Sequence, residues 1–134
     1  MNTTYWRNKI MDDMYGAAAN QFWVGLSSSE PTPQGGNVTE PVGNGYARVR
    51  IPVFTAAVDG TVKNADDIVF PISTGTWFPA DSLATHWVVF DGNGANAHVL
   101  SSGTLEVAIG IWKNTVVTIE ANKVVITLMD YVEE

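Results

Sequence analysis

The sequence predicts a mostly β protein, an antiparallel β-sandwich of jelly-roll-like form with one N-terminal α-helix. After residue 20 the chain is a succession of short apolar runs rich in β-branched and aromatic residues, which is typical of strands. Turn-forming pairs such as Asp59-Gly60 and Ala121-Asn122 separate these runs. Helical patterns, which a parallel sheet needs between its strands, do not recur among them, so an antiparallel arrangement is favoured.

The helix is expected in the N-terminal segment, residues 1–19. Trp6, Ile10, Met14 and Ala17 recur at helical spacing, a threonine at position 3 or 4 can cap the helix, and the glycine at position 16 can end it. The opposite face is polar. We therefore expect the apolar face to lie on a hydrophobic surface, either the protein's own sheet or a neighbouring subunit.

The strands are expected in residues 20–134, and the whole chain, residues 1–134, is expected to form a single domain. The predicted strands cover residues 22–26, 46–55, 68–70, 85–90, 98–100, 104–112, 115–121 and 123–129. Alternation in the second of them predicts one face with Ala47, Val49, Ile51 and Val53 in the core, and a second face with Tyr46, Arg48 and Arg50.

A long polar loop, residues 27–44, joins the first two predicted strands. Its serines, prolines and glycines supply turn chemistry, so the loop can be ordered without helix or strand. Glu30 and Glu40, each followed by a proline, flank the loop. We expect them to fix it by hydrogen bonds or by pairing with Arg48 or Arg50.

Several stretches together resemble a known protein family. They are the helix-like YWRNKIMDDMYG, the aromatic strand ending in GLSSSEP followed by EPVGNGYARV, IVFP with Trp77, the run HWVVFD, and the terminal VVITL. This set resembles a family of small tail-fibre and baseplate-associated proteins of tailed phages and prophages. Two features depart from the family pattern: Phe78 stands where a glycine is expected, and residues 79–83 lengthen the connection that follows.

The resemblance implies a structural component of the virion tail that acts by protein–protein assembly. Such a subunit packs with copies of itself and with other tail proteins. A homo-oligomer with closed symmetry is expected, and a trimer is the natural arrangement for a fibre.

Composition excludes several other classes of function. A net charge of -7 and only 7 basic residues argue against a nucleic-acid partner. The absence of cysteine excludes disulfides and thiolate catalysis. No apolar run approaches the roughly 20 residues that cross a bilayer, and the first residues lack the apolar core of a signal peptide. We therefore expect no membrane insertion, and synthesis in the bacterial host cytoplasm.

The chain shows no constellation of catalytic or metal-binding residues. His86 and His98 each adjoin an apolar run, where a histidine with one hydrogen-bond partner is the commoner role. Neither has a second histidine or carboxylate at metal spacing. Residues 91–96 alternate oxygen ligands with small residues as a calcium loop does, but no bidentate glutamate follows, and a hairpin turn explains the glycines better. We predict no enzyme activity, no cofactor and no metal.

The 5 tryptophans suggest one alternative. Trp77 and Trp112 are expected near strand ends, where an exposed ring could stack on a sugar. The interpretation we favour is that these rings fill the ends of the core or an oligomer contact. Trp23 and Trp87 lie inside apolar runs and are expected in the core.

Two hypotheses follow. The first is an assembling tail protein whose candidate contact residues are Trp6, Ile10, Met14, Glu30 and Glu40. The second is a carbohydrate-binding or host-receptor-binding module whose candidate glycan contacts are Trp77 and Trp112.

Overall fold

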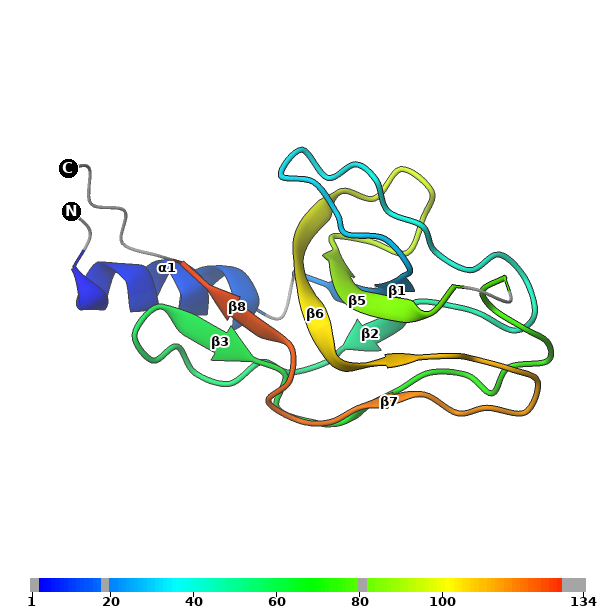
Figure 1. The fold of residues 1–134 in the computed structure, drawn as a ribbon. Coiled ribbons are helices and arrows are strands. Elements are labelled where there is room, and N and C mark those ends of the chain that lie inside the picture. Colours follow the sequence, from blue (N-terminus) through cyan, green and yellow to red (C-terminus); the bar gives the residue numbers. More distant parts are fainter. Residues whose placement is uncertain (1–2, 18–19, 80–81, 129–134) are drawn as a thin grey trace.

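The computed structural model describes residues 3–17, 20–79 and 82–128, and these contain one helix and eight strands (Figure 1). The elements in chain order are α1 (Thr4–Tyr15), β1 (Phe22–Ser27), β2 (Val49–Ile51), β3 (Thr61–Lys63), β4 (Ile68–Val69), β5 (Ala84–Phe90), β6 (Val99–Ile109), β7 (Thr118–Ile119) and β8 (Val125–Thr127). All strand pairs are antiparallel. The predicted class, mostly β with an N-terminal helix, is confirmed.

A four-stranded sheet in the order β2-β1-β5-β6 forms the centre of the fold. In its register Trp23 lies opposite Arg50 on one side and opposite Phe90 on the other, and Ser27 lies opposite His86. Two two-stranded ribbons, β3–β8 and β4–β7, complete the β structure. In Figure 1 the β3–β8 ribbon runs beside α1, and β7 passes beneath the four-stranded sheet.

The apolar core joins the sheet, the ribbons and the helix. Val24 and Leu26 of β1 and Val89 of β5 are fully buried, and they share one cluster with Val62 of β3 and with Met11 of the helix. Burial of this apolar surface is the main source of stability in a chain without cysteines.

A buried asparagine links the segments that carry the ribbons. The Asn64 side chain has no exposed surface. Its amide nitrogen donates to the carbonyls of Asp66 (2.8 Å) and Glu120 (3.1 Å), and its amide oxygen accepts the Val124 N–H (2.9 Å). A buried donor or acceptor that lacks a hydrogen bond costs free energy. The three hydrogen bonds of the Asn64 amide therefore explain how a polar side chain is tolerated in the core.

The predicted turn at Asp59-Gly60 is confirmed. Both residues have positive φ, 52° and 74°, and the Val58 and Thr61 main chains pair across them. Gly60 also has a second constraint, since a Cβ there would lie 2.7 Å from the Leu128 carbonyl oxygen. The turn leads into β3, which the sequence analysis did not predict.

The second predicted strand is much shorter than expected. Residues 46–55 contribute only β2 to the sheet, because Pro52 has no N–H for the ladder. The predicted alternation of core and outer residues fails at both ends of this segment, where Ala47 and Val53 are exposed. Tyr46, predicted on the outer face, packs against the core instead.

Other strand limits also differ from the prediction. The two strands expected over residues 98–100 and 104–112 form one strand, β6. The predicted end of the last strand at residue 129, and residues 1–2 and 18–19 of the N-terminal segment, lie outside the described residues.

Candidate assembly surface

Helix α1 begins and ends where the sequence predicts. The Thr3 hydroxyl accepts the Trp6 N–H at 3.2 Å, which makes Thr3 the N-cap. At the other end the Gly16 N–H donates to the Asp12 carbonyl at 2.8 Å.

Polar side chains fix one face of α1 to the turn that precedes β3. They bind main-chain groups of residues 57–60: Arg7 Nη1 donates to the Asp59 carbonyl (3.0 Å), Asn8 Oδ1 accepts the Gly60 N–H (2.7 Å), and Asp12 Oδ1 accepts the Ala57 N–H (2.8 Å). Hydrogen bonds that involve ionised side chains are stronger than neutral ones. The orientation of the helix about its own axis is therefore set.

The apolar residues on this anchored face are Met11 and Tyr15, which are buried. The Tyr15 ring lies 4.7 Å from the Phe22 ring and 5.0 Å from the Phe54 ring, centroid to centroid. This corrects one expectation, because the face with Trp6, Ile10 and Met14 was a candidate for packing on the protein's own sheet. The anchored face was misread because three of its residues are polar.

Trp6, Ile10 and Met14 form a helix stripe on the remaining surface. Trp6 is 49% exposed and Met14 is 47% exposed, and Ile10 between them is half-buried. Lys9 and Asp13 lie on the same exposed surface and form an ion pair of 3.4 Å. The stripe is thus an uncovered apolar surface with one charge of each sign beside it.

The 27–44 loop, the second candidate contact region, is held at its base by a buried serine. Ser27 Oγ accepts the N–H groups of Ser29 (3.2 Å) and Thr39 (3.0 Å) and donates to the Ser29 carbonyl. Further along, Asn37 Nδ2 donates to the Glu30 carbonyl at 2.9 Å. The loop is ordered by hydrogen bonds, as the sequence predicts.

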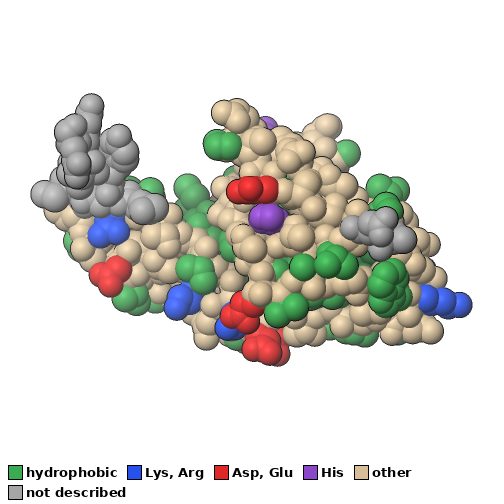
Figure 2. All heavy atoms as spheres, in the orientation of Figure 1, with side chains coloured by type: hydrophobic (Ala, Val, Ile, Leu, Met, Phe, Trp, Pro, Cys, Tyr) green, Lys and Arg blue, Asp and Glu red, His purple; other side chains and the backbone are tan. Residues whose placement is uncertain are grey.

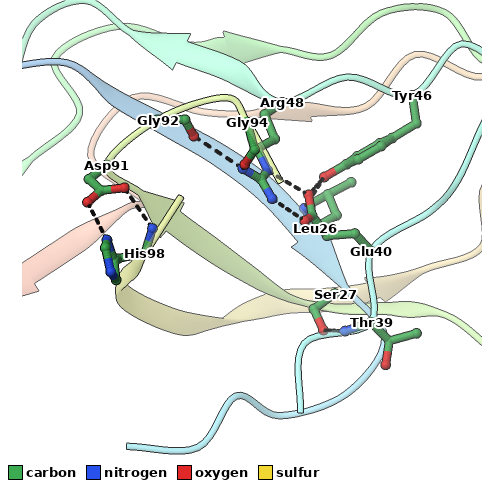
Figure 3. Close-up of polar contacts among 10 residues, drawn as sticks. All are labelled: Leu26, Ser27, Thr39, Glu40, Tyr46, Arg48, Asp91, Gly92, Gly94 and His98. Carbon is green, nitrogen blue, oxygen red and sulfur yellow. Dashed lines mark hydrogen bonds and ion pairs between the residues drawn. The ribbon is translucent and has the colours of Figure 1, made fainter. Parts of the chain in front are cut away.

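Glu40 and Arg48 pair at the end of this loop (Figure 3), which confirms one of the two pairings expected. Arg48 Nη2 lies 2.7 Å from Glu40 Oε1, and Arg48 Nε donates to Glu40 Oε2 at 3.1 Å. The Tyr46 hydroxyl donates to the same Oε2 at 2.5 Å. The side chains of Glu40 and Arg48 are only 18% and 13% exposed. Glu40 therefore makes its contacts within its own chain, whereas the side chain of Glu30 is exposed.

Arg48 extends this network to the hairpin between β5 and β6. Its Nη1 donates to the carbonyls of Gly92 (3.2 Å) and Gly94 (3.1 Å) (Figure 3). Its guanidinium also lies 3.6 Å from the centre of the Phe90 ring. A planar fork that stacks and binds several acceptors at once is a role that lysine cannot fill. The long loop and the hairpin are thus joined into one rigid end of the sheet.

The network shifts the pKa of two of its members. Burial raises the pKa of the Tyr46 hydroxyl far above its usual value, and the Glu40 carboxylate beside it raises it further. The hydrogen bonds from Arg48 to Glu40 raise the pKa of the guanidinium, and burial offsets part of this rise. Both residues keep the protonation state that the network requires at neutral pH.

The structure separates the two tryptophans proposed as glycan contacts. Trp77 is 5% exposed, and its indole N–H donates to the Asn44 carbonyl at 2.8 Å. Its ring packs among Tyr46 and Phe70, so it fills the core and has no free face for a sugar. Trp112 is 52% exposed, with its inner edge over Gly110. Trp112 alone of the pair remains available.

Trp87, Trp23 and the two histidines have local partners or burial in the fold. Trp87 is buried as predicted, whereas Trp23 is half-buried. His86 Nδ1 lies 2.8 Å from the Thr85 hydroxyl, and His98 Nδ1 lies 3.0 Å from an Asp91 carboxylate oxygen (Figure 3). Each histidine has the hydrogen-bond partner that the sequence analysis expected.

The described ranges contain neither a metal-binding cluster nor a membrane-spanning helix. Within residues 3–17, 20–79 and 82–128, no cluster of three or more His, Asp or Glu side chains is arranged to bind a metal ion. In the same ranges no helix has the length and apolar character required to span a bilayer.

A groove lies between β6 and the β7–β8 segment, with a cavity volume of about 410 Å³. The part of β6 that lines it is irregular. Thr104 lies opposite His86 and Ile109 lies opposite Ala84, so residues 105–108 bulge opposite Thr85 alone. Leu105, Ile109, Ile119 and Trp87 give the groove an apolar lining, and Val107 stands exposed on it.

Charged side chains border this groove. Lys123 Nζ lies 2.5 Å from Glu106 Oε1, and Glu120 is close by on the same rim. Figure 2 shows acidic and basic side chains next to each other at the lower edge of the molecule, below exposed apolar groups. Sequence reasoning missed the groove, because the pattern of residues 104–112 reads as an ordinary strand and gives no signal of a bulge.

One comparison with known proteins identifies the chain. No curated protein matches it. The family described as "Podophage GP4 fiber I protein gp80" matches residues 1–127, which is nearly the whole chain and includes α1, the 27–44 loop and all eight strands. The phage tail-fibre resemblance noted in the sequence is thereby confirmed, and the chain belongs to this family of podophage fibre proteins.

Proposed function

We propose that this protein is a non-enzymatic subunit of a phage tail, at the fibre or the baseplate, that acts by protein–protein assembly with itself. Its family is that of a structural fibre protein, so the chain is a phage structural component of the virion. The finer assignment is a homo-oligomer with closed, three-fold symmetry that also contacts other tail proteins.

The helix stripe is the observation that carries this proposal. Polar and apolar contacts on the opposite face of α1 fix the helix so that Trp6 and Met14 remain exposed. Large apolar side chains that cluster on a fixed, exposed element mark an interaction surface. The 27–44 loop, with exposed Glu30 at its start, offers a second, ordered contact region.

The first experiment is the solution mass of the protein by light scattering across a concentration series, with two matched variants. Trp6 and Trp112 are exposed to nearly the same extent, 49% and 52%. We expect W6A to weaken self-association at least about tenfold, since a buried tryptophan is a common hot spot, and W112A to leave it unchanged. A wild-type chain that stays monomeric throughout the series would contradict the homo-oligomer.

A second candidate function rests on Trp112. Its half-exposed ring, next to Lys113 and Asn114 in the sequence, could stack on a sugar, as in a carbohydrate-binding or host-receptor-binding module. On this alternative W112A abolishes binding on a glycan array or to host cells while W6A retains it. Absence of glycan and cell binding in the wild-type protein would remove this candidate.

A further inference from the structure

We propose that the groove between β6 and the β7–β8 segment receives the helix stripe of a second copy of this chain. The inference rests on the proposed function and specifies its contact. The interface would be heterologous: the stripe of one copy, Trp6, Ile10 and Met14, enters the groove of the next copy.

The first argument is the chemical match of the two surfaces. The stripe consists of side chains spaced one helical turn apart, and residues of the bulged half of β6 line the groove, with Leu105, Ile109 and Ile119 among its apolar residues. A helix that places such anchors in an apolar groove is a recurrent mode of recognition. A cavity of about 410 Å³ has room for large side chains, not for a whole helix, so only the stripe would enter.

The second argument is charge complementarity. Lys9 and Asp13 stand beside the stripe as an ion pair of 3.4 Å, and Glu106 and Lys123 stand on the groove rim as an ion pair of 2.5 Å. Each surface thus offers a cation and an anion that pair with each other, and Glu120 adds a further negative charge at the groove rim. On docking, Lys9 can face Glu106 while Asp13 faces Lys123. All four side chains are at least 44% exposed, so exchanging partners sacrifices little, because exposed ion pairs contribute little individually.

The third argument is that the stripe cannot reach a groove in its own chain. Contacts from Arg7, Asn8 and Asp12 to residues 57–60 hold the opposite face of α1 against the β3 turn. Turning the stripe inward would break all of them. The two surfaces are therefore separate on one chain and can meet only between chains. A contact of this type closes into a ring when the rotation allows, and three-fold closure agrees with the proposed trimer.

The experiment is a complementation test with one variant for each surface. M14K with W6A removes the stripe, and V107D places a charge at the groove, where Val107 is 71% exposed and folding should not suffer. Each variant alone is expected to be monomeric by light scattering. Mixed in equal amounts, they are expected to form a heterodimer and nothing larger, because one intact stripe and one intact groove remain between them.

V69D is the matched control, since Val69 on β4 is 53% exposed and does not line the groove. It should assemble as the wild type does. Circular dichroism and thermal unfolding of each variant would test whether the fold is retained. As a further check, K9E and E106K should each weaken association, and a mixture of the K9E and E106K proteins should pair better than either one alone.

Each possible result decides the matter. A wild-type oligomer that V107D leaves intact overturns the groove contact while the tail-assembly function stands. Two monomeric variants that fail to pair when mixed point to a symmetric contact and also overturn it. A wild-type chain that is monomeric at all concentrations overturns both the homo-oligomer and the groove contact. A heterodimer of the stripe variant with V107D supports the proposal, provided that V69D alone assembles as the wild type does.

Discussion

Substituting Gly25 by alanine tests the polar network that joins the long loop to the sheet. Gly25 lies in the middle of β1, directly beneath the network. A Cβ at this position would lie 2.5 Å from the Tyr46 hydroxyl, 2.7 Å from Glu40 Oε2 and 3.3 Å from a ring carbon of Phe90. These groups cannot move freely, because Glu40 is also paired with Arg48.

The expected loss of stability follows from two costs and one smaller gain. Forcing a methyl group into a packed site costs about 1–3 kcal/mol. Displacing the hydrogen bond from Tyr46 to the ionised Glu40 costs about 1.5–3 kcal/mol more, while alanine in place of glycine in a strand returns about 0.5–1 kcal/mol. We expect the free energy of unfolding to fall by about 2–5 kcal/mol.

Urea unfolding followed by fluorescence measures this change, because Trp77 and Trp87 are buried and report on the core. The control is G94A. A Cβ at Gly94 meets no atom within 4 Å, so we expect a change within about 0.5 kcal/mol. In a Tyr46→Phe background the nearest clashing atom is gone, so G25A should cost at least about 1 kcal/mol less there than in the wild type.

A G25A protein as stable as the wild type would refute the reasoning, since it would mean that the network yields without cost. Equal costs of G25A in the wild-type and Tyr46→Phe backgrounds would refute the specific claim that the hydroxyl is the obstacle.

Three further predictions concern single side chains. Because the pKa of Tyr46 is raised on folding, its contribution to stability is complete below pH 10 and is lost as pH rises above that value. Chemical unfolding from pH 8 to 11 should therefore show a smaller alkaline loss in Y46F, and Tyr15, whose pKa burial also raises, contributes to the loss that remains. Replacing the buried Asn64 by alanine leaves its main-chain partners without hydrogen bonds, so the free energy of unfolding, measured by urea unfolding, should fall by about 3 kcal/mol. A loss under about 1 kcal/mol would show that water replaces the amide. Hydrogen bonds from His98 lower the pKa of Asp91, so the contribution of Asp91 to stability is present above its ordinary pKa of 3.8 and is lost as pH falls below that value. D91N should therefore reduce the loss of stability at acid pH. An unchanged dependence of stability on pH would count against the contact between Asp91 and His98.

The parts of the fold with strong local signals could be predicted from the sequence. A threonine cap, a terminal glycine and helical spacing place α1 correctly, and continuous apolar runs locate β1 and β5. The pairing of Glu40 with Arg48 was one of several alternatives that the sequence left open, and the burial of both side chains, which selects it, is visible only in the structure.

The remainder depends on contacts that a single sequence does not display. The three-residue strand β3 has too short a pattern to be recognised, and it exists because Val125–Thr127 pairs with it. The packed face of α1 could not be chosen from hydrophobicity, since Arg7, Asn8 and Asp12 bind main-chain groups of a turn that is distant in sequence. The groove depends on the register of β6 against β5, which is decided only when the strands meet.

The buried asparagine has a consequence for the local dynamics of the chain. The Val124 N–H points to the Asn64 side chain and is completely shielded from water, although Val124 precedes β8 and belongs to no strand. Amide exchange with solvent requires a main-chain hydrogen to be exposed by local opening. This amide should therefore exchange with deuterium as slowly as those of the central strands, so the slowest-opening unit of the molecule extends beyond its regular secondary structure.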